Sequence, residues 1–77
     1  MTDVFMHPIR IAEGEQEPET CDPKEAEGWR VFRTGQPAYF YKNKHRAAVA
    51  FRQLKGGMTR PLDMGGKWWA PATVYLP

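Results

Sequence analysis

The chain has 77 residues, of which 42% are hydrophobic and 13% aromatic, so we expect one core and a single domain over residues 1–77. The single Cys21 excludes an internal disulfide, and no apolar run is long enough to span a membrane, so we expect a cytoplasmic protein without a signal peptide. The net charge of +2 hides a segregation that indicates an electrostatic partner: residues 1–27 carry eight acids against two bases, and the rest carries nine bases against one acid.

The first third of the chain predicts a strand and a loop. Apolar and β-branched residues with partial alternation predict a short strand over residues 4–11. Pro8 has no N–H to donate to a ladder, so we expect this strand at a sheet edge or at a bulge. Residues 12–28 have almost no apolar side chains, which predicts a flexible acidic loop.

The middle of the chain predicts a hairpin followed by a helix. Residues 29–33 and 38–41 have the composition of strands, and residues 34–37 between them have the length and residue types of a hairpin loop. Asn43 is a residue type that caps helices, and it precedes a segment, residues 44–55, whose apolar positions follow helical spacing. Gly56 and Gly57 predict the end of this helix.

A last strand, bent at Pro71, is predicted over residues 68–70 and 73–76. The order of elements predicts an α+β fold, in which a small antiparallel sheet of three to five strands has one helix packed on one face.

The sequence offers little for catalysis or for metal binding. Cys21 stands among acids, which disfavour a reactive thiolate. His7 and His45 lie far apart and belong to no zinc-site spacing, and Asp63 is the only carboxylate in the segment that we expect to be ordered. We therefore expect no enzyme, no metal site and no cofactor.

Basic side chains gather at the predicted helix and just before it, at Lys42, Lys44, His45, Arg46, Arg52 and Lys55. Three of the cations crowd the start of the helix, where the helix dipole disfavours positive charge. Such a placement is expected where side chains contact an anion such as phosphate. The alternative is a solvated helix face whose charges serve solubility.

The predicted strands carry aromatic and basic side chains on both faces, because neighbouring residues alternate. One helix covers one face, so we expect the other to be an exposed aromatic patch ringed by cations. The alternative is that the aromatic side chains only fill the core. Outside the helix, the candidate partner-binding residues are Arg30, Arg33, Tyr39, Tyr41, Lys67, Trp68 and Trp69.

The run over residues 39–50, a strand that enters a helix with basic residues in its first turn, is similar to the last strand and helix of double-stranded-RNA-binding domains. The similarity covers a dozen residues, and no helix is predicted before the strands. We do not infer membership of that family.

These features predict a non-catalytic binding module whose basic, aromatic-rich surface engages nucleic acid or a nucleic-acid-handling complex. The alternative is a small protein-interaction or inhibitor domain, similar in style to accessory proteins of phages and mobile elements, which binds an acidic surface of a host protein through Trp, Tyr and a basic rim. A third hypothesis is a homodimer that forms through the edge strand that contains Pro8 or through the exposed sheet face. A further hypothesis is that the acidic loop folds over the basic surface as a lid.

Overall fold

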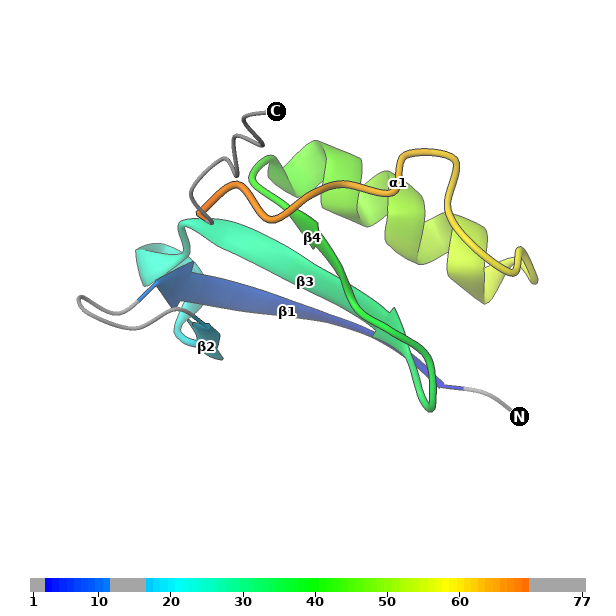
Figure 1. Cartoon of the computed structure of the whole chain (residues 1–77), viewed down its shortest axis with the longest axis horizontal. Helices are drawn as coiled ribbons and strands as arrows, with labels where there is room; N and C mark the ends of the chain where they lie inside the picture. The colour runs from blue at the N-terminus through cyan, green and yellow to red at the C-terminus, as the bar shows by residue number, and fades with distance from the viewer. Residues whose placement is uncertain (1–2, 12–16, 70–77) are drawn as a thin grey trace, which may run out of the picture.

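The computed structural model describes residues 3–11 and 17–69 (Figure 1). The elements are, in chain order, β1 (Val4–Ile11), β2 (Pro18–Thr20), the short 3-10 helix η1 (Pro23–Glu25), β3 (Gly28–Arg33), β4 (Tyr39–Tyr41) and α1 (Lys44–Lys55). The strands form one antiparallel sheet of four in the order β2-β1-β3-β4, and α1 packs on one of its faces. This arrangement confirms the predicted α+β class.

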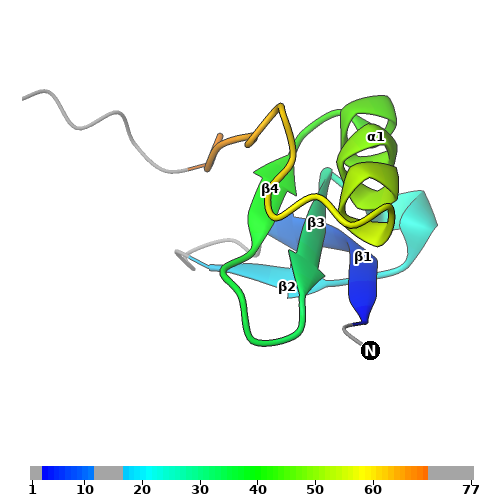
Figure 2. The ribbon, with the colours of Figure 1, turned by 90° about the vertical axis from the view of Figure 1, so that its right-hand side faces the viewer.

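The helix face of the sheet, which we define as the face that α1 covers, holds the core. Residues directly opposite each other in an antiparallel pair point to the same face, and Val31 lies opposite Met6 on one side and Tyr39 on the other. Val31 is fully buried in a cluster with side chains of α1. Figure 2 shows α1 above this side of the sheet, with no helix on the other side among the described residues.

The predicted apolar stripe of the helix supplies the other half of the core. Ala47, Ala50 and Leu54 are each at most 2% exposed, and Phe51 is half-buried at the border of the stripe. The two alanines have short side chains, which let the helix backbone approach the sheet closely enough to exclude water from Val31.

Both ends of α1 lie where the sequence predicts them. The side-chain oxygen of Asn43 accepts hydrogen bonds from the backbone N–H groups of His45 (2.7 Å) and Arg46 (3.3 Å), which would otherwise have no partner in the first turn. After the last turn, Gly57 has a φ of 104°, a left-handed conformation that glycine adopts without steric cost.

The segment predicted as a structureless acidic loop contains β2 and η1. Scarce apolar side chains predicted no regular structure there, but backbone pairing with β1 and two ion pairs from Arg10, to Glu19 (3.0 Å) and Glu25 (3.5 Å), order residues 17–28. The predicted loop therefore contains regular structure at residues 18–20 and 23–25, and its flexibility stays a prediction. Residues 12–16 lie outside the described residues.

Pro8 lies in an unbroken ladder rather than at a bulge. The β1–β3 register runs without interruption from Val4 to Ile9. The carbonyl of Pro8 accepts a hydrogen bond from the N–H of Cys21 (3.1 Å), on the side away from β3. Because N and C=O of one strand residue face the same side, the missing N–H of Pro8 removes no bond between β1 and β3.

The predicted last strand differs from the structure in its first part. Trp68 and Trp69 lie in a turn, in which the N–H of Trp68 donates to the carbonyl of Gly66 (3.1 Å). The N–H of Gly66 in turn donates to the carbonyl of Phe40 (2.9 Å), and within the described residues this segment forms no ladder with β4. Residues 70–76 lie outside the described residues.

Candidate binding surface

Aromatic and basic side chains lie side by side on the face of β1, β3 and β4 that α1 does not cover. We call this the open face; its strand residues are Phe5, His7, Arg30, Phe32 and Phe40. The rings of Phe5 and Phe32 stack with centroids 5.2 Å apart, and His7 meets Phe32 edge-on at 5.7 Å. The guanidinium of Arg30 lies 5.6 Å from the centroid of the Phe32 ring, close enough for a cation–π interaction.

Two tryptophans that follow the sheet in sequence pack on the open face at β3 and β4. Trp69 meets the ring of Phe40 edge-on at 4.8 Å, and Trp68 meets Trp69 in the same way at 4.9 Å. The Trp68 ring lies directly on the backbone of β3 at Gly28, where a side chain of any size would overlap the ring. Because residue 28 has no side chain, the Trp68 ring can pack against the backbone of β3.

The open face has a positive character. Among its positions in β1, β3 and β4 there is no Asp or Glu, and the first acid beyond them is Asp3, one residue before β1. Arg30 and His7 lie opposite each other, and the Nε of Arg30 and the Nδ1 of His7 are buried without a hydrogen-bond partner among the described residues.

A shallow pocket of about 330 Å³ adjoins the tryptophans, lined by Phe40, Lys42, Arg46, Gly65, Gly66, Lys67 and Trp68. Lys42 and Lys67 are exposed, and neither makes an ion pair within the described part of the chain. The backbone at the pocket requires a glycine at residue 65. Its φ of 65° is left-handed, and a side chain there would overlap the carbonyl of Phe40.

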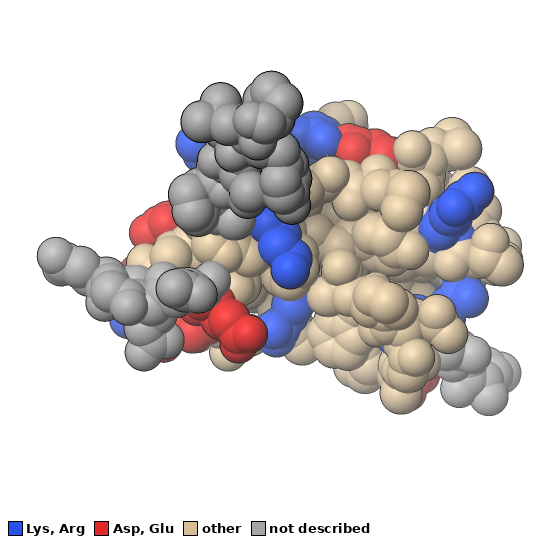
Figure 3. Space-filling model, in the orientation of Figure 1, with Lys and Arg blue, Asp and Glu red and all other residues tan. Residues whose placement is uncertain are grey.

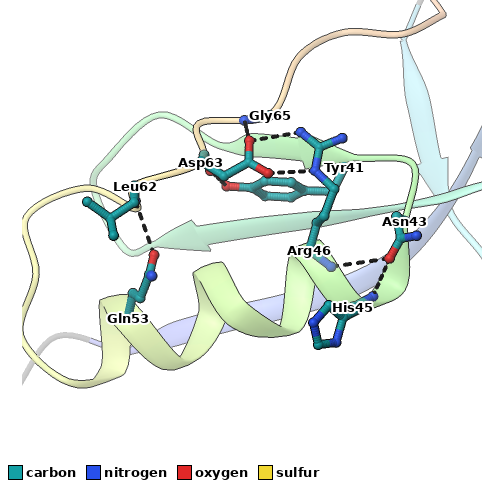
Figure 4. A network of polar contacts seen from close by, with 8 residues as sticks. All are labelled: Tyr41, Asn43, His45, Arg46, Gln53, Leu62, Asp63 and Gly65. Carbon is teal, nitrogen blue, oxygen red and sulfur yellow. Dashed lines mark hydrogen bonds and ion pairs between the residues drawn. The ribbon is translucent and has the colours of Figure 1, made fainter.

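A network of polar contacts fixes the segment that leads to the pocket (Figure 4). The guanidinium of Arg46 donates to both carboxylate oxygens of Asp63, at 2.5 and 2.8 Å, and the N–H of Gly65 donates to the same carboxylate at 3.0 Å. The Arg46 hydrogen bond, then the Gly65 bond, holds the pKa of Asp63 at about 2. The hydroxyl of Tyr41 donates to the backbone carbonyl of Asp63. This network therefore holds the segment around Asp63 and Gly65 against α1 and β4.

Four predicted binding residues make contacts within the fold. Tyr41 is 1% exposed, and burial raises its pKa to about 12. Tyr39 is half-buried on the helix face. Arg33 lies on that face too and donates to two carbonyls at the end of α1, at 3.0 and 2.6 Å. Arg33, Tyr39 and Tyr41 thus point away from the open face and Arg46 is bound to Asp63, and the part of these four residues in partner binding stays a prediction.

Apart from Arg46, which lines the pocket, the basic residues of α1 lie on the opposite side of the sheet from the open face. The Nζ of Lys44 lies 5.3 Å from the ring centroid of Trp29, and that of Lys55 lies 5.1 Å from the ring centroid of Phe51. His45 and Arg52 are exposed on the helix. Of the predicted residues, the structure brings Arg30, Trp68 and Trp69 together on the open face, with Lys42 and Lys67 at the adjoining pocket.

Charge is also segregated in space. Figure 3 shows most of the acidic side chains of this view at the end of the molecule where β2 and η1 lie, whereas Lys and Arg are spread over the remainder. On the side of the molecule that this view shows, acidic side chains thus gather at one end.

Four open-face residues, Phe5, His7, Phe32 and Phe40, were missed as candidates from the sequence. The signal that could have found Phe5 and His7 is alternation within residues 4–11, which places both on the face of the strand opposite Val4 and Met6. Phe5 is one of the large hydrophobic side chains that remain exposed, at 38%.

Within residues 3–11 and 17–69, no group of three His, Cys, Asp or Glu side chains is placed to hold a metal ion. The same residues include no helix long and apolar enough to cross a membrane. Comparison with models of known protein families, with curated proteins and with solved structures finds no match. The similarity of residues 39–50 to double-stranded-RNA-binding domains therefore gains no support from these comparisons.

Proposed function

We propose that this protein is a non-catalytic module that binds single-stranded nucleic acid on the open face. The observation that carries the proposal is the row of aromatic rings, from Phe5 and Phe32 to Phe40 and Trp69, that lies beside Arg30 without an acidic neighbour in the strands. Bases stack on such rings, and the cations attract the phosphates between them.

The geometry favours a single strand over a duplex. Rings that lie on a sheet can stack only with bases whose faces are free, and the bases of a duplex are already stacked on each other. Phosphates would meet Arg30 in the middle of the open face, and Lys42 and Lys67 at the pocket beside Trp68. Stacking and charge without base-edge contacts predict weak dependence on sequence.

The test is fluorescence anisotropy with a labelled oligothymidylate at about 50 mM salt, where phosphate contacts contribute most. We expect Phe5→Ala and Arg30→Ala each to weaken binding about tenfold, since a stacked base contributes roughly 1–3 kcal/mol. Arg52→Ala is the matched control for Arg30→Ala, because it removes the same charge from the exposed side of α1. A duplex of the same length should bind more weakly than the single strand.

Two results would contradict the proposal. One is a loss of affinity with Arg52→Ala but not with Arg30→Ala, which would move the contact to the basic helix. The other is an absence of binding to the single strand even at the lower salt concentration.

A second candidate function, the binding of a protein, rests on a different surface. Leu62 is 81% exposed and Met64 is 50% exposed, and both line a hollow of about 510 Å³ together with Met58, Thr59, Arg60 and Pro61. The loop is held in place, since the N–H of Leu62 donates to the side chain of Gln53 at 3.1 Å (Figure 4). Exposed apolar side chains on a fixed loop are typical anchors for a protein partner.

A Leu62→Asp variant separates the two functions. If the open face binds nucleic acid, this variant should bind the oligothymidylate as the unchanged protein does. If the loop binds an acidic host protein, the same variant should lose a partner that Arg30→Ala retains.

A further inference from the structure

Along one stretch of β1, no strand of the described residues lies on the outer side. The carbonyl of Asp3 accepts a hydrogen bond from the N–H of Thr34 and so points toward the β3 side, whereas the carbonyl of Pro8 accepts from the N–H of Cys21 and points outward. Because the direction alternates along a strand, even-numbered residues of β1 present their N–H and C=O groups outward. The outer partner, β2, pairs only with residues 9–11.

The outward groups of Val4 and Met6 therefore have no partner strand within residues 3–11 and 17–69. No other described residue bonds to them, since the backbone bonds outside the ladders reach β1 only at Asp3, Pro8 and Ile9. Residues 4–7 contain no Lys, Asp, Glu or Pro, the residues that normally prevent an edge from pairing with another chain. This edge is open and apolar.

We propose that this edge pairs in antiparallel fashion with the same edge of a second copy, about a two-fold axis at Phe5. In this register Val4 of each copy lies opposite Met6 of the other, and their outward N–H and C=O groups form four hydrogen bonds. Pro8, which has no N–H, lies just beyond the paired stretch and limits its length.

The choice of a second copy as the partner rests on how the side chains match in this register. Asp3 and His7 lie two residues to either side of Phe5, so each His7 lies opposite Asp3 of the second copy on the open face. Asp3 forms no ion pair with a described side chain. The dimer would therefore contain two contacts between an imidazole N–H and a carboxylate, one on each side of the axis.

The remaining cross-copy pairs are apolar. Phe5 lies opposite Phe5 of the second copy as a pair without hydrogen bonds between its backbone groups, in which the side chains are closest. On the helix face, Val4 and Met6 are half-buried hydrophobic residues at the border of the core, and pairing buries more of their surface. The two sheets would become one, and the two open faces would be continuous across the axis.

Sedimentation equilibrium from about 10 µM to about 1 mM tests the proposal, a range chosen because the interface is small. We expect a concentration-dependent monomer–dimer equilibrium. Met6→Pro removes an outward N–H without touching the β1–β3 ladder, as Pro8 already does, and should weaken dimerisation about tenfold or more. Met6→Leu is the matched control, because it retains the N–H and the apolar side chain, and should leave the equilibrium unchanged.

A cysteine experiment tests the register and does not depend on a proline being tolerated. In a Cys21→Ser background, Phe5→Cys places two thiols directly opposite each other at a backbone distance that a disulfide can span, so oxidised glutathione should yield a covalent dimer. Val4→Cys should not, because Val4 lies opposite Met6. A protein that is monomeric at every concentration overturns the proposal, as does cross-linking at Val4 but not at Phe5.

Discussion

Asp63 is the only acidic residue after residue 27, and the structure uses it to join three parts of the chain. Its carboxylate accepts bonds from the side chain of Arg46 on α1, and its carbonyl accepts the hydroxyl of Tyr41 on β4. The sequence shows that this carboxylate is unusual among bases, but it cannot show which base it meets, because Arg46 is seventeen residues away. Pairing of this kind depends on how α1 packs on the sheet.

The Asp63 carboxylate should make stability depend on pH. Its pKa of about 2 in the folded chain lies below the ordinary value of 3.8, so folding favours the ionised form. This contribution is complete above about pH 5 and is lost as the pH falls to about 2. Urea unfolding across this range should show a smaller loss of stability for Asp63→Asn than for the unchanged protein.

The control for this experiment is Asp22→Asn, since the side chain of Asp22 makes no hydrogen bond or ion pair within the described part of the chain. Its pH profile should match that of the unchanged protein. Parallel profiles for Asp63→Asn and the unchanged protein would show that the Arg46 contact does not stabilise the fold.

Gly28 is a second residue whose importance only the folded chain reveals. Gly28→Ala would push the Trp68 ring off β3, since the added carbon would overlap the ring and approach the carbonyl of Tyr41 to 2.8 Å. We expect a loss of about 1–3 kcal/mol in the free energy of unfolding and a red shift of tryptophan emission. Gly66→Ala is the matched control, because open space surrounds that position. If the two variants are equally stable, the Trp68 ring does not pack against Gly28 as described.

At the scale of elements, local signals explain what the sequence could predict. The bounds of α1 follow from a cap, an apolar stripe and a glycine stop, all of them within fifteen residues, and the hairpin of β3 and β4 follows from a short loop between two apolar runs. By contrast, β2 has hardly any strand-forming residues. It forms because residues 18–20 pair with the backbone of β1. No local sequence pattern indicates this pairing.

The cap of α1 allows a direct test at this scale. Asn43→Ala removes the acceptor for two N–H groups of the first turn and should lower the free energy of unfolding by about 1 kcal/mol. Asn43→Asp retains the acceptor and adds a negative charge at the positive end of the helix dipole, so it should be at least as stable as the unchanged protein. Chemical denaturation of the three proteins checks the order. A destabilised Asn43→Asp would show that the cap does not act as described.

At the scale of the whole molecule, opposite charges lie at different places. Glu19 and Glu25 pair with Arg10 at the end of β1 that is bordered by β2, so these two acids stay at that end. The lid hypothesis for the acidic segment stays a prediction. The sequence predicted both the segregation and a cationic, aromatic surface, but it assigned that surface partly to Tyr39 and Tyr41, because alternation alone does not tell which face the helix covers.

The salt dependence of binding follows from this distribution of charge. If Arg30, Lys42 and Lys67 neutralise three phosphates of a single strand, the logarithm of the affinity should fall against the logarithm of salt concentration with a slope of about −2. Between about 50 and 200 mM salt, this slope corresponds to a loss of about 20-fold. The double variant Lys42→Ala/Lys67→Ala should flatten the slope to about −0.7, because one phosphate contact remains. Replacing Arg52 and Lys55 on α1 by alanine removes the same charge and should leave the slope at −2 if the open face is the only contact. A slope that changes equally in both double variants would mean that the strand responds to the overall charge of the molecule and not to the three cations beside the aromatic rings.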